Sequence, residues 1–460
     1  MIQGLRSLWR RLPIGTSSRG VLKAALVIGI LSALVKVSAV VKESVVAASF
    51  GTSDAYDAFV VASLAPTMVV SLISNSLNAA LIPTYIRVRD GEGQPSADQL
   101  YSSVLTLNLT LLTALSLLIA GTTRFWLPLL ASGFSPEKLA LATQLVYWSM
   151  PLVVASGLAT TWGSVLNAQE RFGLVALAPA FQPLAILVAL ALLSRIWGVG
   201  ALITGTLVGG ALEAGIIGFN LMSRGHSVWP RWFGLTDHVR KVAGQYGATI
   251  GGAFLITSMG LVDQGMASML GPGSNSALSY GMKIPMAFSG LAMTALGTAV
   301  LPRFSRFASG ENWPEFRTTL KRYVLVVGAL SIVMAIVLAK ASVVMTQVLY
   351  QRGRFSAQDT QIVSQVQMWY LLRLPIPITG TLLVRALNAL RANQVLATIA
   401  VLQALLNAGL DWLLMRHMGA PGIAAASFAV SVVAFMCIST AIWWLLNRRC
   451  RDVATMDDRP

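Results

Sequence analysis

The sequence has few charged residues, few histidines and almost no cysteine. Charged side chains make up 11% of the 460 residues, far below the roughly 25% of an ordinary soluble domain. Two cysteines, Cys437 and Cys450, are too few for a disulfide framework. The three histidines lie in predicted loops without metal-site spacing, and no nucleophile elbow, P-loop or HExxH motif occurs. We therefore predict no catalytic residues, no metal site and no resident cofactor.

Long apolar stretches dominate the chain instead. Apolar residues make up 55% of it, and the mean hydropathy is +0.69. Stretches of about 20 or more apolar residues are long enough to cross a bilayer as helices. The predicted spans are 22–49, 57–86, 101–122, 139–168, 173–195, 198–222, 242–269, 276–302, 323–349, 360–388, 393–415 and 420–446. The sequence thus predicts an all-α polytopic membrane protein with about twelve transmembrane helices.

An internal repeat divides these spans into two halves. The motif ALIPTYIR at residues 80–87 returns as AVLPRFSR at 299–306, and LNA at 166–168 reappears at 387–389. Each half holds about six spans, an even number, so the repeats cross the membrane in the same direction. We therefore predict two parallel, pseudo-symmetric six-helix bundles around a central cavity. The predicted divisions are an amphipathic basic segment at 1–20, bundles at 21–226 and 227–446, and a basic tail at 447–460.

The basic residues predict the orientation of the chain. The formal net charge is +16, and most Lys and Arg residues fall in alternate loops and in both tails. Basic loops mark the cytoplasmic side of a membrane protein, so both termini are predicted to be cytoplasmic. No basic patch is interleaved with aromatic residues as a nucleic-acid surface would be. Membrane lipids, and not nucleic acids, are the expected partners of these charges.

Charged residues inside the predicted spans are the candidate functional residues. A charge at the bilayer centre costs about 2.5–3.5 kcal/mol on insertion scales, so each needs a partner or a water-filled cavity. The predicted substrate-binding residues are Lys36, Lys42, Lys283 and Arg373. Asp263 and Glu213 are candidates for binding a coupling ion, Na⁺ or H⁺. Two simpler interpretations stay open, an ion pair of Lys42 with Glu43 and an Asp57 that caps the second span.

The sign of these charges indicates the kind of substrate. Cations outnumber anions in the predicted cavity, and lysines bind phosphate groups as point charges. A phosphate or diphosphate therefore fits this cavity. A pump for cationic drugs would instead be expected to have a carboxylate-lined pocket.

Several motifs in this order closely resemble a known family. They are Lys36-x5-Lys42-Glu43, Phe50-Gly51, the run from Asp57 to Ala62, Pro66, the ALIP segment, and Lys283-x4-Phe288-Ser289-Gly290. This combination resembles the MurJ/MviN lipid II flippases of the multidrug/oligosaccharidyl-lipid/polysaccharide exporter superfamily. The resemblance implies a MATE-like fold and alternating access. It also implies transport of a polyprenyl-diphosphate-linked saccharide across the bacterial inner membrane.

The resemblance also implies roles for single residues. Lys36, Lys42 and Lys283 stand where the family has cavity arginines that contact the diphosphate, and Asp57 matches its outer-gate aspartate. We assign Glu43 to the gate as well. Val70 departs from the family, because it replaces another arginine.

The departures leave the saccharide open between a peptidoglycan precursor and an exopolysaccharide repeat unit. A MATE-type drug/cation antiporter is the alternative function, and a non-transporting scaffold for a polysaccharide synthase is a third. The expected driving forces are the membrane potential, Na⁺ or H⁺. Glycosyltransferases or polymerases of the same pathway are the expected protein partners.

Overall fold

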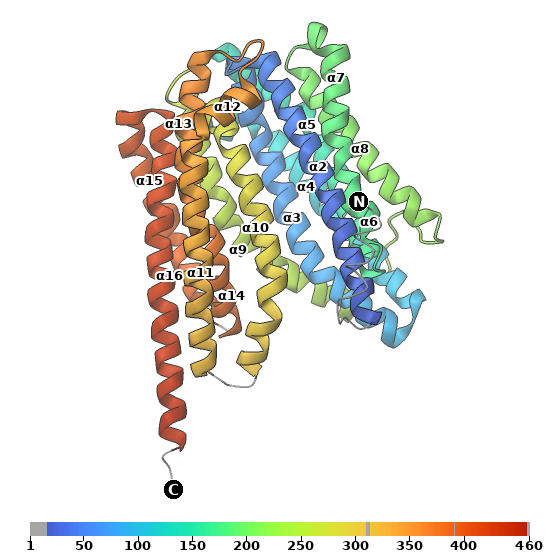
Figure 1. Ribbon diagram of the computed structural model, residues 1–460. Coiled ribbons are helices and arrows are strands. Elements are labelled where there is room, and N and C mark those ends of the chain that lie inside the picture. Colours follow the sequence, from blue (N-terminus) through green and yellow to red (C-terminus); the bar gives the residue numbers. More distant parts are fainter. Residues whose placement is uncertain (1–15, 310–312, 391, 458–460) are drawn as a thin grey trace, which may run out of the picture.

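The computed structural model describes residues 16–309, 313–390 and 392–457. This part of the chain consists of helices joined by short turns and by one longer loop at residues 223–236, and it contains no strand. The prediction of an all-α membrane protein is therefore confirmed (Figure 1). Most of the predicted amphipathic segment, residues 1–15, lies outside the described residues.

The first half of the chain forms long, closely packed helices. These are α2 (Thr16–Phe50), α3 (Asp54–Glu92), α4 (Gln94–Leu130), α5 (Pro136–Ala168), α6 (Phe172–Leu177), the 3₁₀ turn η1 (Ala178–Ala180), α7 (Phe181–Trp197) and α8 (Gly200–Met222). Gly205 and Gly209 of α8 lie directly against α7. A β-carbon at either glycine would stand 2.5 Å from the Cα atom of Ile186 or Gln182. Small residues thus let the two backbones approach closely, as in other membrane helix pairs.

The second half repeats this pattern. It contains α9 (Asp237–Ser268), α10 (Ser274–Ser309), α11 (Trp313–Lys340), α12 (Ser342–Tyr350), α13 (Ala357–Arg373), α14 (Pro375–Ala389), α15 (Asn393–Met418) and α16 (Ala420–Asp457). A capping box starts α13, because Ser356 and Asp359 each accept a hydrogen bond from the backbone N–H of the other. The last helix continues beyond the predicted span end at 446 and through most of the predicted tail.

The number of membrane spans differs from the expectation of twelve. Within the described ranges, nine helices are long and apolar enough to cross a membrane by length and composition. The helices α2, α9 and α10 are 35, 32 and 36 residues long but are not among the nine. These three helices carry Lys42, Asp263 and Lys283, whereas Glu213, Arg373 and Asp57 lie on helices that are among the nine. The count of twelve is not confirmed.

The helices form two groups around separate apolar cores. In Figure 1, α2–α8 lie on one side and α10–α16 on the other. One buried cluster joins α3, α4, α5 and α8 with the start of α9, and another joins α11, α14 and α16. A third cluster contains residues of both groups, among them Tyr56 and Tyr280. The two groups therefore share a core at one end of the molecule.

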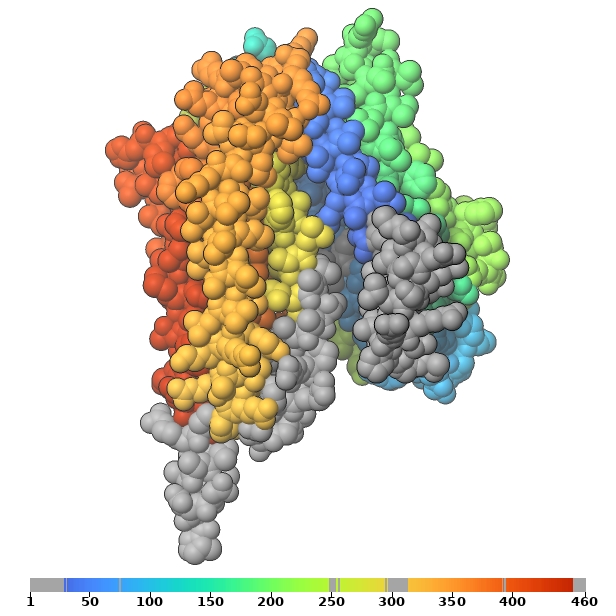
Figure 2. Space-filling model, viewed as in Figure 1, coloured from blue at the N-terminus to red at the C-terminus, as the bar shows by residue number. Residues whose placement is uncertain are grey.

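We call this end the closed end. The ring centroids of Tyr56 and Tyr280 lie 4.9 Å apart, and the backbone N–H of Arg354 donates to the carbonyl of Ala48 at 2.8 Å. Figure 2 shows the α12–α13 region packed against α2 at this end. Gly353 has a φ of +56°, and a β-carbon there would stand 2.4 Å from the Ala48 oxygen. Toward the opposite end, where α2 begins and α16 ends, the helices of the two groups spread apart (Figure 1).

Candidate functional site

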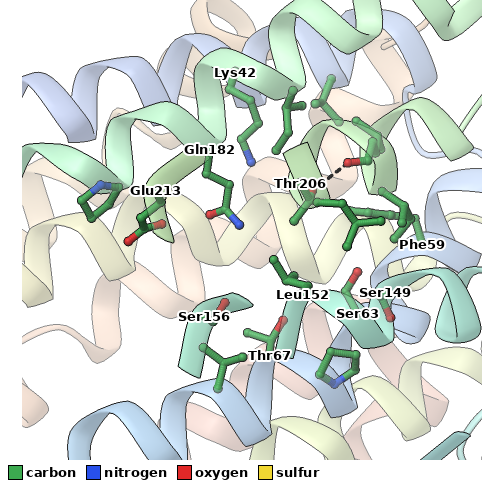
Figure 3. Close-up of a pocket in the computed structure, with 18 of the residues that line it drawn as sticks. Lys42, Phe59, Ser63, Thr67, Ser149, Leu152, Ser156, Gln182, Thr206 and Glu213 are labelled. Atoms are coloured by element: carbon green, nitrogen blue, oxygen red, sulfur yellow. Dashed lines mark hydrogen bonds between the residues drawn. The ribbon is translucent and has the colours of Figure 1, made fainter. Parts of the chain in front are cut away.

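A cavity of about 490 Å³ lies among the helices of the first group (Figure 3). Its wall is formed by α2, α3, α5, η1, α7 and α8, and Lys283 reaches it from α10. The polar lining residues are Lys42, Ser63, Thr67, Ser149, Ser156, Thr160, Gln182, Thr206, Glu213 and Lys283. Both the volume and the mixed lining are typical of a small-molecule site.

Two lysines of this cavity share one carboxylate. Lys42 Nζ lies 2.5 Å from Glu43 Oε1, and Lys283 Nζ lies 2.9 Å from the same oxygen. The Glu43 side chain is 8% exposed, whereas those of Lys42 and Lys283 are 19% and 39% exposed. Two cations and one anion leave this cluster with a net positive charge. The ion pair expected as an alternative for Lys42 is present, and the cluster remains open to a further anion.

The other two predicted substrate-binding residues lie outside the cavity wall. Lys36 is half-buried, and its Nζ stands 4.0 Å from where a β-carbon on Gly290 of α10 would lie. It therefore faces the second group. Arg373 ends α13, and its Nε is buried without a hydrogen-bond partner. Val70, which departs from the family pattern, does line the cavity. The structure thus brings together Lys42 and Lys283 but not all four cations.

Asp57 links the two groups at the closed end. Its carboxylate is fully buried and accepts hydrogen bonds from Lys138 Nζ, Gly273 N and Ser276 N, each at 2.7 Å, and from Ser276 Oγ at 2.5 Å. Lys138 also pairs with Asp54 at 2.6 Å. We call the Asp57 carboxylate and these three partners the Asp57 latch. Asp57 therefore contacts the start of α10 and does not cap its own helix, because its carboxylate bonds elsewhere. The cap position of α3 is Ser53, whose side chain makes no capping bond.

A second contact joins the groups beside the latch. Thr52 Oγ1 donates a hydrogen bond to Asp359 at the start of α13. Sequence reasoning missed Lys138, Ser276 and Asp359 because each lies in a turn or at a helix end. Polar residues at such positions usually serve as caps.

Asp263 of α9 lies in a separate buried cluster with Asn407, Asp411 and Ser427, which we call the Asp263 cluster. Asn407 Nδ2 donates to Asp263 at 2.6 Å and to Asp411 at 2.7 Å, and Ser427 Oγ donates to Asp263 at 3.0 Å. The other oxygen of Asp411 is buried without a partner. Sequence reasoning singled out Asp263 but missed Asn407 and Ser427. The spacing of Asn407 and Asp411 by four residues, which places both on one helix face, was the available signal.

The sequence as a whole matches a known family. The profile of the family described as "Lipid II flippase MurJ" matches residues 46–456. The chain belongs to the MurJ lipid II flippase family. Its members are transporters, so the protein is a transporter and not an enzyme.

Individual relatives agree with this assignment. The protein is 24% identical to a Synechocystis protein named "Probable lipid II flippase MurJ", over 95% of this chain and 83% of the relative. It is 26% identical to the "Lipid II flippase MurJ" of Burkholderia cenocepacia, over 79% of this chain and 72% of the relative.

Solved structures show the same fold. An inward closed lipid II flippase MurJ matches 95% of this chain and 93% of its own, with a TM-score of 0.78 at 20% identity. An inward-facing multidrug resistance MATE family transporter matches 92% of this chain and 95% of its own, with a TM-score of 0.73 at 11% identity. The predicted MATE-like fold is therefore confirmed.

Proposed function

We propose that this protein moves a polyprenyl-diphosphate-linked saccharide across the bacterial inner membrane by alternating access. The observation that carries the proposal is the meeting of Lys42 from α2 and Lys283 from α10 at one cavity. Membership of the lipid II flippase family supports the same substrate class. The saccharide is a peptidoglycan precursor or an exopolysaccharide unit.

In this mechanism the diphosphate binds between the two lysines. Its oxygens replace the shared Glu43 carboxylate as the partner of each ammonium group. Because Lys42 and Lys283 belong to different bundles, one bound diphosphate contacts both bundles at once. The bundles then rock against each other and expose the diphosphate on the outer side of the membrane. Lys36, which faces α10, and Arg373 supply further positive charge. The lipid tail stays in the bilayer throughout.

We assign the closed end to the outer side of the membrane and both termini to the cytoplasm. The basic loops support this orientation. The Asp57 latch, together with Glu43, then acts as the outer gate. With the inside negative, the membrane potential favours outward movement of an anion by about 2.3 kcal/mol per charge per 100 mV.

The proposed moving units are the predicted bundles at 21–226 and 227–446, except that the connecting loop at the start of the second moves with the first. The connecting loop is anchored on the first of them, because the backbone N–H groups of Arg231 and Phe233 donate to Ser102 Oγ at 2.9 Å and Ser103 Oγ at 3.2 Å. Glycosyltransferases or polymerases of the same pathway are the proposed protein partners.

The Asp263 cluster is the proposed site of ion coupling. Asp263 and Asp411 share one amide donor, Asn407, at 2.6 and 2.7 Å. Two carboxylates this close repel each other unless positive charge offsets them, and Arg373 lies close enough to Asp263 to supply one such charge but not two. Na⁺ or H⁺ bound to this cluster would reset the bundles after release of the substrate.

The experiment that tests the proposed function is removal of both cavity lysines. We expect the double variant Lys42→Ala/Lys283→Ala, reconstituted into vesicles, to flip a labelled polyprenyl-diphosphate saccharide at least tenfold more slowly. Lys340→Ala, which changes an exposed lysine at the end of α11, is the matched control and should keep the parent rate. Undiminished flipping by the double variant, at equal protein content, would overturn the proposal.

A drug/cation antiporter is the second candidate, favoured by the buried carboxylates of Asp263 and Asp411. That function predicts efflux of cationic dyes that is abolished by Asp263→Asn and insensitive to the two lysine changes.

A further inference from the structure

Glu213 is a second carboxylate near the candidate substrate. Neither Lys42 nor Lys283 pairs with it, because both pair with Glu43. It lies on α8, is half-buried and lines the same cavity as Lys42 and Lys283. It forms no hydrogen bond or ion pair with any residue in the described part of the chain. A carboxylate within a membrane span is costly without a compensating partner. The partner of Glu213 is therefore expected to come from a molecule that enters the cavity.

The packing of α7 against α8 fixes where this carboxylate lies. Gly209 approaches Gln182 so closely that a β-carbon would stand 2.5 Å from the Gln182 Cα atom. Glu213 follows Gly209 by one helical turn and so shares its face. In Figure 3 the Gln182 side chain is drawn between those of Glu213 and Lys42. The cavity thus has a carboxylate in one part of its wall and the lysine cluster in another.

The wall of this cavity is suited to a saccharide. Hydroxyl and amide side chains line it, including those of Thr67, Ser156, Gln182 and Thr206. Such groups both donate and accept hydrogen bonds, as sugar hydroxyls do. A carboxylate among them accepts hydrogen bonds but donates none, and its charge makes a bond to a cationic donor stronger than one to a neutral donor.

We infer that Glu213 binds a protonated amine on the saccharide or on a peptide attached to it. The cavity then selects a zwitterionic headgroup, with the diphosphate at Lys42 and Lys283 and the ammonium group at Glu213. This inference rests on the proposed function and narrows its substrate class. It gives Glu213 a role in substrate selection, and the coupling ion is left to the Asp263 cluster.

The test compares headgroups that differ in one charge. The protein is reconstituted into vesicles with polyprenyl-diphosphate disaccharides that carry a free sugar amine or its acetylated form. A second pair carries a short peptide with a free or an acetylated lysine side chain. We expect the parent to flip the free-amine member of one pair at least tenfold faster than its acetylated partner. The pair that shows the preference identifies whether the amine belongs to the sugar or to the peptide.

Variants then assign the preference to Glu213. Glu213→Gln keeps the size of the side chain but removes its charge, so we expect it to flip both members of each pair at the parent's acetylated rate. Glu213→Asp should retain part of the preference. Glu137→Gln, which removes an exposed carboxylate at the start of α5, should behave as the parent.

The outcomes separate this inference from the proposed function. Equal rates for free and acetylated headgroups in the parent overturn the inference without any variant, while the flipping itself upholds the proposed function. A Glu213→Gln variant that slows all headgroups by the same factor also overturns it, because ion coupling would act in that way. No flipping of any headgroup by the parent overturns the proposed function and the inference with it.

Discussion

Removal of the Asp57 carboxylate should open the closed end of the molecule. Asp57→Ala deletes four hydrogen bonds of 2.5–2.7 Å from a fully buried group. Loss of one member of a buried ion pair costs about 3–5 kcal/mol. Because Lys138 keeps Asp54 as a partner at 2.6 Å, we expect the lower value, about 3 kcal/mol. Opening this end separates α3 from α10 and breaks the latch, so its loss should raise the open population about 100-fold.

Cysteine labelling measures this change directly. Cys437 and Cys450 are replaced by serine, and Ser63→Cys places one thiol in the cavity wall. A membrane-impermeant maleimide is then added from the outside. We expect Asp57→Ala to raise the labelling rate of this thiol by about 100-fold. Asp54→Ala is the matched control, because Asp54 is 58% exposed. Its loss should change the rate by no more than about twofold, as exposed pairs contribute little.

The reasoning would be refuted by equal labelling rates in Asp57→Ala and the parent, provided that the variant is folded. Faster labelling from the cytoplasmic side alone would instead reverse the assignment of the closed end to the outside.

Three further changes test other parts of the structure. Gly353 has a φ of +56°, and a β-carbon there would stand 2.4 Å from the Ala48 oxygen. Gly353→Ala should therefore destabilise the closed conformation by about 1–3 kcal/mol and speed labelling of Ser63→Cys from the outside. An unchanged labelling rate would argue against this contact as part of the closure. Asp263→Asn should remove the dependence of transport on a Na⁺ or H⁺ gradient but retain binding of the lipid-linked saccharide, measured in detergent. An unchanged gradient dependence would place ion coupling elsewhere. Ser102→Ala/Ser103→Ala removes two hydrogen bonds to the connecting loop, each of which stabilises its docking by about 1 kcal/mol. This variant should be cleaved faster by a protease between residues 223 and 236. An unchanged cleavage rate would show that other contacts hold the loop.

The sequence predicted the membrane fold and part of the site. Charges are rare inside the apolar stretches, so Lys42 and Lys283 stood out, and each lies a similar number of residues from a turn, at Gly51 and at Gly271. The structure brings both to Glu43. Depth follows from residue counting because a helix rises by a constant 1.5 Å per residue.

The remaining features depend on how the helices rotate and pack. Lys36 and Lys42 share one helix, yet only Lys42 lines the cavity, since the direction of each side chain is set by the rotation of α2. The partners of Asp57 include two backbone N–H groups, which leave no trace in a sequence. The position of the cavity inside the first bundle follows from side-chain volumes on several helices. None of these properties is local, so a pattern along the chain does not determine them.

The Asp57 latch has a consequence for how this protein tolerates change. Two of its bonds come from main-chain amides at Gly273 and Ser276, and every amino acid except proline supplies such a group. A mutation at Ser276 therefore removes the bond from its hydroxyl but keeps the main-chain bond. Gly273 is different, because its φ is +83° and a β-carbon there would stand 2.8 Å from the Thr52 oxygen. A small tilt or slide of α10 weakens all of these bonds together, since hydrogen bonds weaken steeply with misalignment. Apart from Gly273, the latch thus depends more on the position of α10 than on the side chains that this helix carries.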